Sequence, residues 1–186
     1  MFERYTESAR RTLFFARYEA SQQGSESIEP EHILAGLLRE RAGIPLAVLK
    51  GASTTPGQIR TDLELAIVTK PKLSTSVEIP FSPPVKRILQ FAAEEADRLT
   101  HRYIGTEHLL LALLREEKTV AWDVLTKRGL SLTDARNKVV ESLDRRSGEA
   151  EDGKTGLARD DMRTRVLQRI NEIRLMLDEL ERDLEL

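Results

Sequence analysis

Two stretches decide how this chain folds, EHILAGLLRE at residues 31–40 and EHLLLALLRE at residues 107–116. They are nearly the same sequence and stand 76 positions apart. Each places leucine or isoleucine at the spacing of one helix face, so each predicts an amphipathic helix with a wide apolar stripe. A helix that recurs at a fixed offset indicates an internal duplication.

The match continues without a gap from about residue 6 to residue 67 at the same offset. A register that holds over this length predicts two copies of one folding unit. We call residues 1–68 the first copy and residues 82–143 the second copy. Residues paired by the offset include Leu13 and Leu89, Phe15 and Phe91, Glu19 and Glu95, Ile28 and Ile104, and Arg60 and Arg136.

Each copy is predicted to contain four helices. In the first copy they are expected near residues 6–23, 30–40, 45–50 and 56–68, and the last two of the second copy near 120–127 and 132–143. Thr6 and Ser82 are candidate N-caps, Gly129 is a candidate helix stop, and Ser131 with Asp134 marks a helix start. Strand periodicity is not sustained elsewhere, so the predicted fold class is all-α, with two tandem four-helix repeats related by pseudo-twofold symmetry.

Residues that are typical of loops set the expected domain limits. Residues 69–81 are rich in proline, serine and threonine and predict an extended connector between the copies. After the double-repeat domain, residues 1–143, the stretch 144–158 is polar and contains glycine, which predicts a linker.

Residues 159–186, which we call the C-terminal segment, carry a heptad pattern that predicts a coiled-coil helix. The segment is basic at its start and acidic at its end, which suits an antiparallel partner and predicts a homodimer. Packing against the repeat domain or against another protein is the alternative. The predicted seam residues are Val166, Ile170, Ile173, Leu177, Leu180 and Leu184.

The composition narrows the class of protein. Of the 186 residues 40% are hydrophobic and 32% charged, which is typical of a globular domain. The net charge of −2 gives no basic field for nucleic acid or a membrane surface, and no apolar run is long enough to span a bilayer. Cysteine is absent and the N-terminus lacks a signal-peptide pattern, so a cytoplasmic location is expected.

The repeated stretches resemble the N-terminal domain of the Clp family of AAA+ unfoldases, above all that of the ClpC type. The resemblance rests on RYTESARRTLFFARYEA and IEPEHILAGLLRE in the first copy, and on PFSPPVKRILQFAAEEA and YIGTEHLLLALLRE in the second. It implies a docking platform for adaptors and substrates. The phosphate-binding motif G-x-x-x-x-G-K-[ST] does not occur in these residues, so no nucleotide or other cofactor is expected.

The resemblance also implies two pockets for phosphorylated arginine. A carboxylate would bind the guanidinium, and a hydroxyl at a helix N-terminus would favour the phosphate. The matching residues are Thr6, Arg10 and Glu31 in the first copy and Ser82, Lys86 and Glu107 in the second. The sequence departs from the family pattern at Glu29, which adds a negative charge, and at Pro83 and Pro84, which lack backbone donors. The alternative is that both glutamates only stabilise a first helical turn.

Histidines and carboxylates are the side chains that could bind a metal or act in catalysis. His32 and His108 are equivalent but lack a second histidine at i+4, so a structural role at a helix start is expected and no metal. His101 receives no role. The carboxylates are expected on solvated helix faces and no nucleophile motif is present, so no catalytic residue is predicted.

The predicted function is a non-enzymatic protein-binding module of the Clp proteolysis and chaperone system. Its expected partners are Clp ATPase or protease subunits, adaptors or substrate proteins. The alternative is a stand-alone reader of phosphoarginine in protein quality control. A scaffold built by the C-terminal segment overlaps with both.

Overall fold

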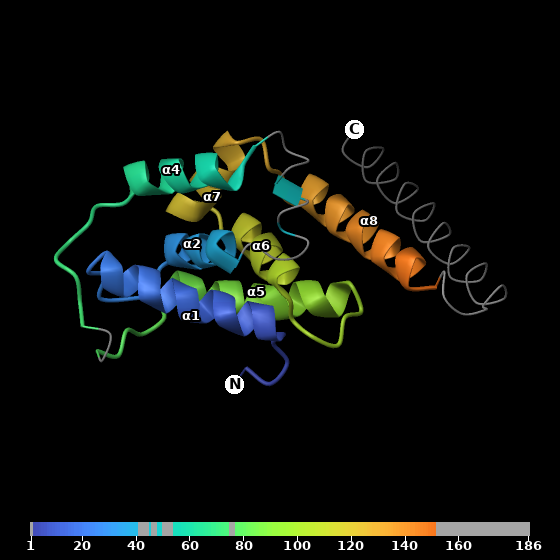
Figure 1. Ribbon diagram of the computed structural model, residues 1–186, viewed down its shortest axis with the longest axis horizontal. Helices are drawn as coiled ribbons and strands as arrows, with labels where there is room; N and C mark the ends of the chain where they lie inside the picture. The colour runs from blue at the N-terminus through green and yellow to red at the C-terminus, as the bar shows by residue number, and fades with distance from the viewer. Residues whose placement is uncertain (1, 41–44, 46–47, 50–53, 75–76, 152–186) are drawn as a thin grey trace, which may run out of the picture. The chain divides into compact units, whose positions relative to one another are not determined.

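The computed structural model describes residues 2–151 except 41–44, 46–47, 50–53 and 75–76. Within these residues the secondary structure is helical, with two isolated β-bridges and no strand, so the predicted all-α class is confirmed. Pro45, Val48 and Leu49 are also helical, and the rest of the predicted 45–50 helix lies outside the described residues. The helices are α1 (Glu7–Gln22), α2 (Pro30–Glu40), α4 (Pro56–Ala66), α5 (Pro83–Arg98), α6 (Thr106–Arg115), α7 (Val120–Lys127) and α8 (Leu132–Glu151) (Figure 1).

The predicted helix boundaries follow from local hydrogen bonds. The Thr6 hydroxyl accepts from the Ala9 amide, and the Ser82 hydroxyl accepts from the Val85 amide, so both are N-caps as predicted. At α8 the Ser131 hydroxyl accepts from the Asp134 amide and donates to its carboxylate. Gly129 has a φ of 77°, the left-handed conformation of a helix stop, as expected.

The repeated leucine-rich helices form the centre of the double-repeat domain. Figure 1 shows α2 and α6 between α1 and α5 on one side and α4 and α7 on the other, and contacts join α2 to each of the other five helices. Their apolar stripes are almost completely buried because both sides are covered. The largest fully buried side chains include Ile33, Leu34, Leu109, Leu110, Leu111 and Leu113.

The two copies are joined by reciprocal parallel bridges. Tyr5 pairs with Ile104, and Ile28 pairs with Phe81. The offset of the repeat converts one pair into the other, so the two bridges are the same contact made twice. In each case the segment before the first helix of one copy lies against the segment before the second helix of the other copy. The two copies are therefore held together at two equivalent places.

Gly36 allows α2 to pack closely on α1. A Cβ at this position would overlap the carbonyl oxygen of Thr12 and come within 3.1 Å of the Ala16 amide nitrogen. The two helices therefore approach more closely than a side chain at this position would allow. Its equivalent in α6, Ala112, is completely buried but carries a methyl group, so the two helix pairs are not packed identically.

The end of α8 differs from the sequence prediction. Helix α8 continues to Glu151, into the stretch 144–158 that was predicted to be a linker. The residues DRRSGEAE contain one glycine and no proline, and most are good helix formers, so the helix propagates. Contacts divide the chain into Met1–Leu143 and Asp144–Leu186. The heptad seam Val166–Leu184 lies outside the described residues.

No helix within the described residues has the length and apolar composition needed to cross a membrane.

Candidate functional site

Backbone hydrogen bonds place each predicted N-cap residue against the other copy. The Thr6 amide donates to the carbonyl oxygen of Ile104 at 2.9 Å, three residues before Glu107. The Ser82 amide donates to the carbonyl oxygen of Ile28 at 3.1 Å, three residues before Glu31. The N-cap hydroxyl of each copy thus lies beside the segment that carries the other copy's glutamate.

Glu31 lies at the opposite end of α1 from Thr6. It lines a hollow of about 150 Å³ together with Gln23 and Ser25, which follow the C-terminal end of α1. Helix α1 has 16 residues, and at 1.5 Å per residue it is about 24 Å long. The expected combination of Thr6 with Glu31 in one pocket is therefore wrong, because a four-helix copy does not fold its own two helix starts together.

The two glutamates have different surroundings. The Glu107 carboxylate is folded towards the backbone of Gly105, where any side chain would overlap it, and it accepts from the Thr106 hydroxyl at 3.4 Å. In the first copy Glu29 occupies the place of Gly105. Burial raises the pKa of Glu31, a backbone hydrogen bond opposes this, and the negative charge of Glu29 raises the pKa further.

The contact between Ser82 and Ile28 brings both departures from the family pattern to the same composite site. Pro83 and Pro84 follow Ser82, so α5 has no amide donors at its first two positions. Glu29 adds its charge beside Glu31, at the same composite site. The site composed of Thr6 and Glu107 has neither change. Arg10 and Lys86, expected to add positive charge, are both exposed to solvent.

His32 and His108 are buried and make the same hydrogen bonds. Nδ1 of His108 accepts from the Gly105 amide at 2.8 Å, so the ring proton is on Nε2, which donates to Nδ1 of His101 at 2.8 Å. Nδ1 of His32 accepts from the Glu29 amide at 2.8 Å, and Nε2 lies 2.9 Å from Oε1 of Gln23. Burial lowers the pKa of each ring to about 4, so both are neutral at pH 7.

Three potential metal ligands group around His108. Potential ligand atoms of His101, Glu107 and His108 lie within 4.8 Å of one another. Both nitrogens of His108 already make hydrogen bonds, and a metal on Nε2 would displace the bond to His101. His32 makes equivalent hydrogen bonds, with Gln23 in place of His101. These bonds stabilise the start of a helix in both copies. His101, which sequence analysis left without a role, is the acceptor in it.

The prediction that the carboxylates lie on solvated faces is wrong for three of them. Glu95 is completely buried, and Glu19 and Glu116 are less than 10% exposed. Glu95 is held by Arg115 at 3.0 Å and by Arg136 at 2.6 Å. Every buried side-chain nitrogen and oxygen among the described residues has a hydrogen-bond partner, so the polar atoms of these acids are satisfied within the fold.

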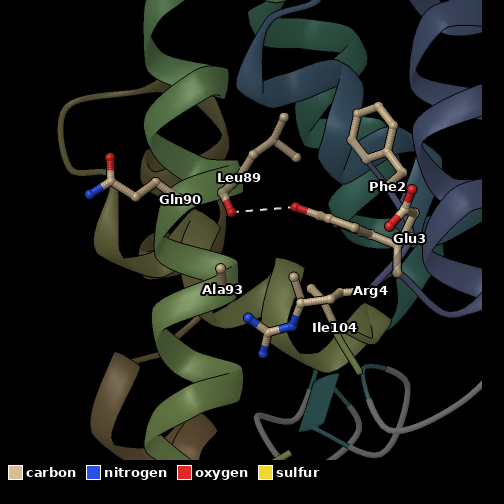
Figure 2. A pocket seen from close by; sticks show the side chains of 8 residues that line it. Phe2, Glu3, Arg4, Leu89, Gln90, Ala93 and Ile104 are labelled. Atoms are coloured by element: carbon tan, nitrogen blue, oxygen red, sulfur yellow. Dashed lines mark hydrogen bonds between the residues drawn. The ribbon is translucent and has the colours of Figure 1, made fainter. Parts of the chain in front are cut away.

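A cavity of about 470 Å³, not expected from the sequence, lies beside residues 2–5. Figure 2 shows Phe2, Glu3 and Arg4 facing Leu89 and neighbouring residues of α5. The Tyr5 hydroxyl donates to the Leu89 carbonyl oxygen at 3.3 Å, and its burial raises the pKa of Tyr5 to about 12. Phe2 and Tyr5, on either side of Arg4, were the signal in the sequence that this segment could line an apolar cavity. Only the bridge between Tyr5 and Ile104 places them over α5.

Comparisons with known proteins identify the family of the chain. A profile described as Clp repeat (R) N-terminal domain matches residues 4–128 and 80–177. The chain is 43% identical over 143 residues to an ATP-dependent Clp protease ATP-binding subunit ClpA homolog of Guillardia theta, and 41% identical over 155 residues to the chloroplastic chaperone protein ClpC of Pisum sativum. These matches cover 77% and 83% of the chain but only 17% and 16% of the relatives.

Solved structures show the same fold. The N-terminal domain of the chaperone ClpD from Arabidopsis thaliana superimposes with a TM-score of 0.61 at 26% identity, over 77% of this chain and 97% of that one. The N-domain of ClpV from Vibrio cholerae gives a TM-score of 0.66 at 18% identity, over 77% and 87% of the two chains, and is similar in fold alone. With its duplicated helices, its interlocked copies and the profile match over most of its length, this chain belongs to the Clp repeat N-terminal domain family.

Proposed function

We propose that this chain is a protein-binding module of the Clp proteolysis and chaperone system. The observation that supports this most directly is the interlocked double repeat, which belongs to a family of N-terminal domains of Clp ATPases. Its buried acids are fully paired with arginines, which supports a rigid binding platform and not a catalytic centre. We infer docking to Clp ATPase or protease subunits, adaptors or substrates.

Only the docking role is inferred from the relatives. This chain spans about a sixth of the length of the relatives, and ATP binding belongs to the whole Guillardia theta protein, whose name includes it. A cytoplasmic location is part of the proposal, and a chloroplast is the alternative because the pea relative is chloroplastic.

Immobilised full-length chain exposed to purified Clp ATPase, protease subunits and adaptors tests the proposal. We expect at least one of them to bind in a saturable manner, and we expect the chain alone to hydrolyse no ATP. An unrelated helical domain of similar charge on the same surface is the control. If every Clp component binds both surfaces equally, the proposal is wrong.

A second candidate function is recognition of phosphorylated arginine at the composite site of Thr6 and Glu107. Helix α1 offers the Glu7 and Ser8 amides next to the Thr6 cap, and Glu107 lies beside Gly105 without an added acid. A phosphate would meet the positive end of the helix, and the carboxylate would meet the guanidinium. Calorimetry with free phosphoarginine tests this, and absence of heat at millimolar ligand would exclude it.

A further inference from the structure

An exposed stripe of aromatic and basic residues follows α1. It consists of Arg10, Phe14, Arg17 and Tyr18, which recur at helical spacing, and we call it the α1 stripe. Phe14 is 67% exposed and Tyr18 36%. Beside them is a hollow of about 170 Å³, lined by Phe14, Arg17 and Tyr18 and by Ser21 and Ile79.

The second copy shows that the fold does not require these aromatic side chains. The residues of α5 at the equivalent positions are Lys86, Gln90, Ala93 and Glu94. Gln90 donates to Glu94 at 3.0 Å, and Glu94 pairs with Arg115 at 2.8 Å.

The corresponding arginine of the first copy, Arg39, differs in one contact. Arg39 stacks over Phe15 at 5.1 Å as Arg115 stacks over Phe91 at 4.2 Å, but Arg39 also stacks over the ring of Tyr18, 4.6 Å from its centroid, where Arg115 pairs with Glu94. At the positions of Phe14 and Tyr18 the first copy is thus aromatic and the second copy polar. Exposed aromatic side chains that packing does not require are typical of a protein-binding surface.

The charges of the α1 stripe indicate the chemistry of the partner. Arg10 precedes Phe14 by four residues and Arg17 follows it by three, so the exposed ring has a cation on both sides along the helix. The Arg17 guanidinium also donates to the Val77 carbonyl oxygen at 3.1 Å, beside the hollow. The stripe contains no acid, whereas its counterpart in α5 contains Glu94. An acidic partner would therefore be attracted to the first copy and not to the second.

The size of the hollow indicates how the partner is held. A volume of about 170 Å³ is below the range of small-molecule sites and suits one apolar side chain. Nucleic acid is disfavoured because two arginines neutralise few phosphates and the whole chain has a net charge of −2.

We propose that the α1 stripe binds an acidic peptide segment of a partner protein, with one bulky apolar side chain of that segment in the hollow beside Phe14 and Tyr18. Carboxylates on either side of this anchor would face Arg10 and Arg17. The proposal rests on the protein-binding function above and identifies its surface and the chemistry of its partner.

Fluorescence anisotropy on the full-length chain tests the proposal. The probes are labelled peptides of equal length with glutamates on both sides of a central Phe, Tyr, Leu or Ile. Matched peptides carry lysine in place of glutamate or serine in place of the anchor, and a single-stranded DNA oligonucleotide is the last probe. We expect the acidic peptides with an apolar anchor to bind at least about tenfold more tightly than their lysine or serine counterparts. Added salt should weaken their binding.

The internal repeat supplies the matched variant. Phe14→Gln with Tyr18→Glu copies the second copy, where Gln90, Glu94 and Arg115 form the same set, so the variant should fold normally. We expect it to reduce peptide affinity about tenfold or more, while Gln90→Ala on the second copy leaves it unchanged. Circular dichroism and thermal unfolding establish that both variants are folded.

The proposal fails if the acidic peptides bind no better than the lysine peptides, if the folded double variant binds like the native chain, or if the oligonucleotide displaces the peptide. Clp components in the capture assay separate this result from the wider function. If they bind the double variant as well as the native chain, the α1 stripe is the wrong surface and the docking function stands. If they bind neither chain, the docking function itself fails.

Discussion

The carboxylate of Glu95 is completely buried and lies 2.6 Å from a guanidinium nitrogen of Arg136, 41 residues further along the chain. Glu19 and Arg60 make the equivalent contact in the first copy at 3.4 Å. Each pair ties the first helix of a copy to its last helix. The second copy has the shorter contact and the more buried arginine, so its acid should contribute more to stability.

Replacing Glu95 by alanine should lower the free energy of unfolding by about 3 kcal/mol, because Arg115 and Arg136 would lose their shared partner. Glu19→Ala, the matched change in the first copy, should cost less, since Arg60 is more exposed to water. Urea unfolding of the full-length chain measures both. Equal losses for the two variants would contradict the ranking.

The same carboxylate should contribute to acid sensitivity. Burial alone would raise the pKa of Glu95, but the hydrogen bond and charge of Arg136, with the charge of Arg115, hold this pKa below its usual value of 4.5. A group with a lowered pKa in the folded state stabilises the fold above its unfolded pKa and loses this contribution as the pH falls. The stability of Glu95→Gln should therefore decrease less than that of the native chain below pH 4.5.

The buried histidines should make stability fall between pH 6.5 and about 4. His32 and His108 have pKa values lowered from 6.5 to about 4 by burial, so in this range the unfolded chain binds protons that the folded chain excludes. Each ring should account for a loss on the order of 3 kcal/mol by pH 4. Chemical unfolding at a series of pH values measures the slope.

Variants separate the hydrogen bonds of His108 from its titration. In His108→Asn the amide oxygen can still accept from Gly105, but the bond to His101 is lost, so we expect a loss of about 1–2 kcal/mol at pH 7 and a shallower decline towards pH 4. His101→Gln keeps an acceptor in place and should be close to native. An unchanged pH slope in His108→Asn would show that other groups cause the decline.

Gly36→Ala should destabilise the fold by about 1–3 kcal/mol, although alanine is the better helix former. The new methyl group would overlap the carbonyl oxygen of Thr12 and force α1 and α2 apart. Gly57→Ala is the control, because the nearest atom to a Cβ there is 3.9 Å away and the position is exposed. Thermal unfolding should show the first variant less stable than the native chain and the second no less stable.

If the chain binds phosphoarginine, the two composite sites should differ. Glu107→Gln should abolish the stronger binding event, since it removes the carboxylate partnered with Thr6. Glu31→Gln should have little effect, because its site combines Glu29 with Pro83 and Pro84 at the start of α5. Isothermal calorimetry of the two variants decides this. Stronger dependence on Glu31 would show that the crossed assignment is wrong.

The predicted homodimer depends on the C-terminal segment. Removing residues 155–186 should convert a dimer into a monomer, because the seam from Val166 to Leu184 supplies the expected interface. Sedimentation equilibrium of both chains at micromolar concentration measures the change. A full-length monomer would remove the dimer hypothesis and leave the segment to another contact.

Tertiary structure changed how the predicted site residues are grouped. Thr6 and Glu31 belong to one copy in the sequence, but parallel bridges place Thr6 beside the other copy. The contact of Thr6 depends on which backbone segments meet across the domain, and the residue pattern of one segment does not encode this. His101 accepts a hydrogen bond from the buried His108 ring, a local contact within the loop and helix start of the second copy.

The sequence by itself determined the duplication, the helices and their caps. These depend on apolar spacing of 3.6 residues and on side chains such as Thr6 and Ser82 that bond within one turn, so neighbouring residues are enough to specify them. Only the tertiary structure decided that the segment before the first helix of each copy contacts the other copy, and that Glu95 is buried. It also brought both departures from the family pattern to the composite site of Ser82 and Glu31. Those features arise from packing between residues far apart in the chain, where burial and pairing depend on the partner surface and not on local sequence.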